Sequence, residues 1–231
     1  MWIFFLGIIV ELIILGILSY RLTQLSFTVL MHLTRSRSVA VTILTIILFP
    51  GTVIHELSHL FTAEILGVHT GTLTLAPESI EGEEIQSGSV QIAVTDPFRR
   101  TLIGIAPTIT GMITLSALSW WLSIVMSRLS DPLYQLLAVA ILYLILTVSN
   151  TMFTSKEDLK GVLPVAVTLV LLLGAFYISG IRIVLPVHIQ TTLATITQSL
   201  AQYLAAVVVI NLMGILTSTL LLLLLQKRHH S

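Results

Sequence analysis

Cysteine is absent from this chain of 231 residues, and charged residues are scarce, at 10% of the sequence. Without cysteine the chain can form neither a disulfide nor a thiolate metal site, so a bound metal ion would need histidine and carboxylate ligands. A soluble domain has about a quarter charged residues. With 55% hydrophobic residues and a mean hydropathy of +1.01, most of this chain is expected to be surrounded by lipid.

An excess charge of either sign is also absent, because eleven Lys and Arg residues balance eleven Asp and Glu residues. This balance gives no indication of a nucleic-acid partner. The apolar segment at the start of the chain has no basic region before it and no small-residue cleavage site after it. We therefore expect it to be kept as a membrane-spanning helix rather than removed as a signal peptide.

Six apolar segments are long enough to cross a bilayer, which requires about 20 residues of helix. They lie at about 2–20, 39–66, 101–126, 133–149, 162–181 and 200–226. We predict an all-α polytopic membrane protein of about six transmembrane helices, forming a single domain over residues 1–231. Two connecting segments stay open. Residues 21–38 can extend the first helix or lie at the membrane surface, and 183–199 can be a loop, a re-entrant piece or an interfacial helix.

The distribution of basic residues does not predict which way the helices are oriented in the membrane. With six spans, one side carries five Lys or Arg residues, namely Arg21, Arg35, Arg37, Arg128 and Arg182. The opposite side carries six, namely Arg99, Arg100, Lys156, Lys160, Lys227 and Arg228. A difference of one charge does not decide which end faces the cytoplasm.

Residues 70–95 depart from the helical pattern. Val90, Ile92 and Val94 alternate with other residue types, residues 72–75 alternate in a similar way, and an acidic stretch containing glycine lies between the two runs. Alternation with a period of two on both sides of turn-forming residues predicts a β-hairpin, inserted after the second helix. Because unpaired strand edges are not tolerated in lipid, we expect this hairpin in water or in a cavity lined by protein.

The second apolar segment contains the sequence HELSH at residues 55–59. His55 and His59 are one helical turn apart, so they project from the same face and can bind one zinc ion. Glu56 lies beside them and can act as a general base on a zinc-bound water molecule. Ionisable groups within an apolar span are costly and are functional by default, so we predict a catalytic site with one Zn²⁺ per chain.

A catalytic zinc ion usually has three protein ligands and one open position, so a third ligand is expected from elsewhere in the chain. Glu64 is a poor candidate, because its position nine residues after His55 places it on the opposite face of the helix. Asp158 is a better candidate, since it lies in a polar break between the fourth and fifth apolar segments, where the backbone can line a cavity. Glu157 is adjacent to it, and the residues alone do not exclude Glu157.

Three elements of the chain resemble the site-2 protease family of intramembrane zinc metalloproteases, and they occur in the family's order. They are HELSH, the sequence GIAPTITG around Pro107, and the segment from Asn150 to Asp158. Asn150 and Asp158 have the spacing of the family motif Asn-x-x-Pro-x-x-x-x-Asp-Gly, and Pro107 matches the proline of Gly-Pro-x-x-Asn. The resemblance covers roughly residues 39–162. The chain departs from these motifs at Thr110, Phe153 and Leu159.

This resemblance implies a multi-pass protein of a prokaryotic cell membrane that hydrolyses peptide bonds of a membrane-anchored protein. It also implies Asp158, rather than Glu157, as the third zinc ligand. It places Asn150 near the site, either in a transition-state role or as a cap on the end of a helix. The alternative is a non-proteolytic relative with a binding or regulatory role, which the degenerate motifs support and the intact Glu56 argues against. A small transporter would need more ionisable residues on several helices, and only Glu11 meets that description.

Peptide hydrolysis within a membrane requires access for water and an unwound substrate. We expect polar residues to line the route for water, although each of them can equally satisfy its own helix: Thr52, Ser58, Thr62, Thr110 and Asn150. The hairpin can bind an unwound substrate along a strand edge by β-augmentation, or it can simply cover the cavity.

Overall fold

The computed structural model describes residues 2–75, 89–152 and 186–229, together with four short pieces at 167–168, 171–172, 174–175 and 178–180. The described chain is almost entirely helical, with one small antiparallel sheet. In chain order its elements are α1 (Trp2–Thr34), α2 (Arg37–Ile65), β1 (Thr70–Thr74), β2 (Ser89–Ile92), α3 (Pro97–Met126), α4 (Pro132–Thr151) and α6 (Val187–His229).

Five helices of the described chain are long and apolar enough to cross a membrane, namely α1, α2, α3, α4 and α6. They correspond to five of the six predicted spans. The remaining predicted span, 162–181, lies mostly outside the described residues and stays a prediction. Large aliphatic side chains are exposed on all five helices, for example Ile13, Ile46, Ile113, Leu136 and Leu224. Such exposed aliphatic surface agrees with surroundings of lipid rather than water.

Two helices are longer than the predicted spans. Residues 21–34 continue α1, which settles one of the two connecting segments. Residues 187–199 begin α6 rather than forming a loop, a re-entrant piece or a separate interfacial helix. Neither stretch contains glycine or proline, so nothing in either sequence interrupts a helix that the apolar part has already formed.

The starts of α2, α3 and α4 follow from their capping residues. The side chain of Ser36 accepts a hydrogen bond from the backbone N–H of Val39, and Asp96 and Asp131 accept from the N–H groups of Arg99 and Leu133. Proline occupies the first position of α3 and of α4, where its missing N–H has no helical partner to lose. These caps place the helix starts close to where the apolar pattern predicts them.

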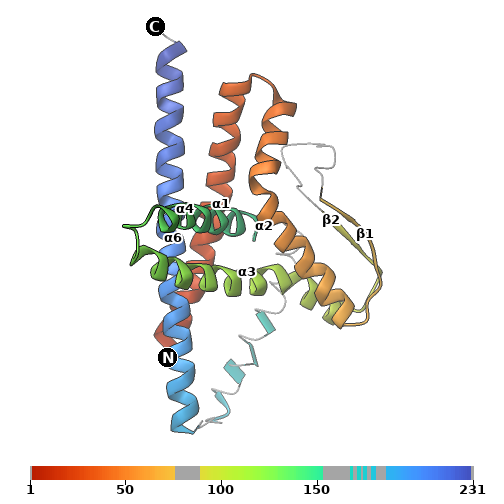
Figure 1. The fold of residues 1–231 in the computed structure, drawn as a ribbon. Helices are drawn as coiled ribbons and strands as arrows, with labels where there is room; N and C mark the ends of the chain where they lie inside the picture. Colours follow the sequence, from red (N-terminus) through yellow and green to blue (C-terminus); the bar gives the residue numbers. More distant parts are fainter. Residues whose placement is uncertain are drawn as a thin grey trace.

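The long helices α1 and α6 run parallel, with both N-termini toward the same end of the molecule (Figure 1). They pack directly against each other, since a Cβ atom at Gly214 of α6 would lie 3.0 Å from the Leu22 side chain of α1. Helices α3 and α4 run across this pair (Figure 1). The main core is formed where α1, α3, α4 and α6 meet, by Ile8, Leu15, Leu115, Val125, Ala138, Ile141, Ile145, Val148, Met152, Leu204 and Val207.

The predicted hairpin is confirmed. Strands β1 and β2 pair in antiparallel fashion, with Leu73 opposite Val90 and Thr74 opposite Ser89. In Figure 1 the hairpin lies alongside the second half of α2, after the helix has changed direction partway along its length. Pro50 lies in the middle of α2, and a proline inside a helix removes one backbone hydrogen bond and bends the helix. The bend therefore directs the HELSH segment toward α3 and the hairpin.

Candidate metal centre

The two histidines of the HELSH segment face each other from successive turns of α2. Both are buried, with 7% of each residue exposed. Their Nε2 atoms are 3.3 Å apart, and the two rings meet edge to face with centroids 4.9 Å apart. The spacing of four residues therefore does bring the two imidazole nitrogens together, as the sequence predicts.

This geometry can be compared with what a zinc ion requires. Zinc binds histidine nitrogens at about 2.0–2.1 Å with tetrahedral geometry, which places two nitrogen ligands roughly 3.3 Å apart. The Nε2 atoms of His55 and His59 are separated by 3.3 Å. The histidine pair therefore fits two of the positions around one tetrahedral zinc ion.

The second nitrogen of His59 is held by α3. Its Nδ1 atom lies 2.8 Å from the backbone carbonyl oxygen of Ile103. A carbonyl can only accept a hydrogen bond, so Nδ1 carries the proton and Nε2 presents a lone pair. Metal-binding histidines commonly have this outer hydrogen bond, which sets their tautomer and ring orientation. Sequence analysis did not predict the role of Ile103, because any residue type can supply a backbone carbonyl.

Glu56 follows His55 directly on α2 and is also buried, with 6% of the residue exposed. Its position directly after His55 makes it the candidate to exchange protons with a molecule bound at the histidine pair. Glu64, by contrast, is exposed at the end of α2 and accepts a hydrogen bond from the Thr70 hydroxyl of β1 at 2.8 Å. Its contact with the hairpin agrees with the prediction that Glu64 is not a metal ligand.

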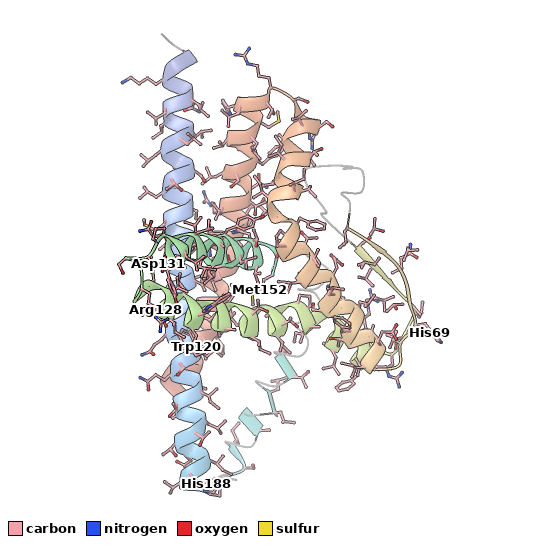
Figure 2. All side chains as sticks on the ribbon, viewed as in Figure 1. His69, Trp120, Arg128, Asp131, Met152 and His188 are labelled. Carbon is pink, nitrogen blue, oxygen red and sulfur yellow. The ribbon has the colours of Figure 1, made fainter. Side chains whose placement is uncertain are left out.

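The end of α4 packs against α2 one turn before His55. A Cβ atom at Gly51 would overlap with the backbone of Thr147 and the side chain of Thr151. Directly after α4, Met152 packs against Gly111 of α3 (Figure 2 labels Met152). The chain therefore leaves α4 between α2 and α3, the two helices that form the His59–Ile103 contact.

The predicted third ligand follows this point in the chain. Asp158, its neighbour Glu157 and the motif positions Phe153 and Leu159 lie outside the described residues. Among the residues that the structure does describe, no group of three His, Asp or Glu side chains could hold a metal ion. The described residues thus offer two possible ligands, His55 and His59, and the choice of a third between Asp158 and Glu157 stays a prediction.

Asn150 lies in the last turn of α4 and is buried. Its amide nitrogen donates to the carbonyl of Leu146 at 2.6 Å and to the Oδ1 atom of Asn211 in α6 at 3.4 Å. Its own Oδ1 atom is buried without a hydrogen-bond partner among the described residues. Asn150 is therefore joined to its own helix and to α6, and its free acceptor can receive a hydrogen bond from water or from a substrate N–H.

The predicted lining residues fall into two groups. Thr62 and Thr110 lie in an open, largely apolar groove between α2 and α3, together with Ile65, Leu66, Leu102, Ala106 and Ile109. The hydroxyls of Thr52 and Ser58 instead donate to carbonyls of their own helix, those of Leu48 and His55. For these two residues the structure favours the interpretation as helix contacts.

Among the described residues, no other histidine completes a metal-binding group with His55 and His59. Figure 2 places His69 beside the hairpin and His188 at the start of α6, far apart along the molecule.

Comparisons with protein-family models, with curated proteins and with solved structures found no match to this chain. The geometry around His55 and His59 therefore carries the functional argument.

Proposed function

We propose that this chain is an intramembrane zinc metalloprotease of the site-2 protease type. The observation that carries the proposal is the buried pair of Nε2 atoms, 3.3 Å apart, in which His59 is oriented by a carbonyl from a neighbouring helix. A pair of imidazoles with this separation matches tetrahedral zinc. Its position on one of the five described helices that are long enough to cross a membrane supports a site at membrane depth.

In this proposal His55, His59 and Asp158 hold one zinc ion, and the fourth position is left for water. Zinc bound there would polarise the scissile carbonyl and lower the pKa of the water molecule to about 7. Glu56 takes the proton from the water and passes it to the leaving amine. Asn150 offers its Oδ1 atom as an acceptor for a substrate N–H, which would help to orient the peptide.

The proposed substrate is a membrane-anchored protein in a prokaryotic cell membrane. A transmembrane helix must unwind before its backbone can reach the site, because its N–H and C=O groups are otherwise bonded to each other. The hairpin beside α2 supports this step, since a strand edge can pair with an unwound segment by β-augmentation. The groove between α2 and α3 offers apolar side chains next to the same helix.

The first experiment measures zinc per chain in detergent-purified protein. The wild type is expected to hold about one zinc ion, and His59→Ala and Asp158→Ala are expected to lose it or bind it much more weakly. Glu64→Ala is the matched control, because it removes a carboxylate from the same helix at a position that contacts Thr70.

A well-folded wild type without zinc would overturn the proposal. Loss of zinc in His59→Ala but not in Asp158→Ala would show that another residue is the third ligand, and Glu157→Ala would be measured next. Zinc binding without any cleavage of transmembrane substrates, in a wild type that behaves like Glu56→Gln, would favour the non-proteolytic relative. The altered motif positions Thr110, Phe153 and Leu159 make that comparison necessary.

A further inference from the structure

The carbonyl that holds His59 has lost its usual partner within α3. In an α-helix the carbonyl of each residue accepts a hydrogen bond from the N–H four residues later. Four residues after Ile103 comes Pro107, which lies inside α3 and has no N–H. Both residues are buried, and a buried backbone carbonyl requires a donor from elsewhere.

His59 supplies that donor from α2, at a distance of 2.8 Å. The contact is supported by apolar packing between the same helices, since Ile103 forms a small buried cluster with Ala63 and Val68. The position of Ile103 against α2 therefore does not depend on the hydrogen bond alone. What the hydrogen bond determines is the tautomer of His59 and the direction of its Nε2 lone pair.

We propose that Pro107 is a positioning residue of the metal site, acting through Ile103 and His59. Its missing N–H leaves the Ile103 carbonyl free to accept from Nδ1 of His59. Nε2 of His59 is thereby kept as a lone pair facing His55. The inference rests on the zinc site of the proposed function and is independent of whether the protein cleaves peptides.

The experiment compares wild type and Pro107→Ala by two measurements, the zinc dissociation constant and the ¹⁵N chemical shifts of His59 in zinc-free protein. Alanine restores the N–H, which competes for the Ile103 carbonyl within the helix. We expect zinc to bind about 10–100-fold more weakly. We also expect the ¹⁵N shifts to move from an Nδ1–H tautomer toward a mixture. Pro132→Ala is the matched control, because this proline opens α4 and releases no carbonyl.

A second variant separates the missing N–H from the shape of the ring. An ester in place of the peptide bond before residue 107, introduced with an α-hydroxy acid, removes the N–H without a ring. Zinc affinity and tautomer close to those of the wild type would support the proposal even if Pro107→Ala folds poorly. Wild-type affinity and an unchanged His59 tautomer in folded Pro107→Ala would overturn it. A wild type that binds no zinc would overturn the proposed function, while the His59 tautomer would still test the role of Pro107.

Discussion

At the scale of single residues, His55 and His59 can interact through their Nε2 atoms in two ways. Because His59 uses its Nδ1 proton on Ile103, its Nε2 atom is an acceptor, and His55 can donate its own Nε2 proton to it at 3.3 Å. A zinc ion bound between them would require His55 to carry its proton on Nδ1 instead. The same distance thus serves a hydrogen bond or a shared metal ion, and metal analysis distinguishes them.

Glu56 provides the residue-scale prediction about catalysis. Glu56→Gln keeps the size of the side chain and removes its ability to take a proton. We expect zinc to stay at about one ion per chain, and cleavage of a transmembrane substrate to fall by roughly 10²–10⁴-fold, the usual contribution of a general base. Equal cleavage by the two proteins would show that another group takes the proton.

The residue types of the site were more predictable than its contacts. The approach of His55 to His59 was predicted from spacing, because helical periodicity requires positions four apart to share a face, whereas the role of Glu56 stays a prediction. The contact of His59 with the Ile103 carbonyl was not predicted, since no side chain marks a backbone carbonyl. The one indication was Pro107, four residues later, whose consequence for a carbonyl depends on α3 being helical and adjacent to α2.

At the scale of elements, the contact between α2 and α4 depends on the absence of a side chain at Gly51. A Cβ atom there would overlap with Thr147 and Thr151. We expect Gly51→Ala to lower the free energy of unfolding by about 1–3 kcal/mol, because the helices must separate. Thermal unfolding in detergent measures the change. Gly7→Ala is the control, since no atom lies within 4 Å of that added Cβ, and it is expected to be neutral or slightly stabilising.

The N-terminus of α3 is expected to respond to pH. The backbone N–H of Arg99 and the Arg99 side chain, 3.2 Å away, hold the pKa of Asp96 below its ordinary value. The stabilising effect of the charged cap is therefore fully present above the unfolded pKa of about 4 and is lost as pH falls through the lower folded value.

Hydrogen exchange at the first amides of α3 measures this effect. The protection of these amides in the wild type, taken relative to the intrinsic exchange rate at each pH, should fall as the pH falls into that range. Asp96→Asn should keep the cap and lose the pH dependence, because asparagine caps helices without a charge. The same pH dependence in Asp96→Asn would assign the effect to another group.

Helix and strand types were predicted more reliably than helix ends. The hairpin and five apolar helices follow from periods of two and from apolar length. The continuation of α1 to residue 34 and the start of α6 at residue 187 were not predicted. When glycine and proline are absent, polar residues in a helix give the same sequence pattern as polar residues in a loop.

At the scale of the whole molecule, a buried polar network joins three helices. Asn211 of α6 is fully buried and donates to the Ser149 hydroxyl of α4 at 2.9 Å, and Ser19 of α1 donates to the carbonyl of the same Ser149 at 2.6 Å. We expect Asn211→Ala to destabilise the fold by about 1 kcal/mol. Unfolding in detergent against Thr217→Ala, an exposed control on α6, measures it. An equal loss of stability in both variants would show that the hydrogen bonds of Asn211 do not stabilise the fold.

The parallel arrangement of α1 and α6 changes which basic residues are expected on the same side of the membrane. A six-span topology puts the end of α6 opposite the connection between α1 and α2, whereas the structure puts both at the same end (Figure 1). The basic residues at the two places, Arg35, Arg37 and Lys227, are therefore on one side.

Single-cysteine labelling tests this arrangement directly, because the chain has no cysteine of its own. We expect Ser38→Cys and Gln226→Cys to react with a membrane-impermeant thiol reagent from the same side of the membrane. Thr191→Cys, near the start of α6, should react from the opposite side. Labelling of Ser38→Cys and Gln226→Cys from different sides would contradict the parallel arrangement.

The length of α6 has a mechanical consequence. With 43 residues and a rise of about 1.5 Å per residue, the helix is roughly 64 Å long, whereas a bilayer with its headgroups is about 40–45 Å thick. Set upright, α6 therefore acts as a rigid rod that stands about 20 Å clear of the lipid. Its apolar residues favour the later turns for the bilayer, so the threonine-rich first turns form the free end. A force applied at that tip, or the binding of a molecule there, would therefore act through an unbroken helix on Asn211 and on the end of α4.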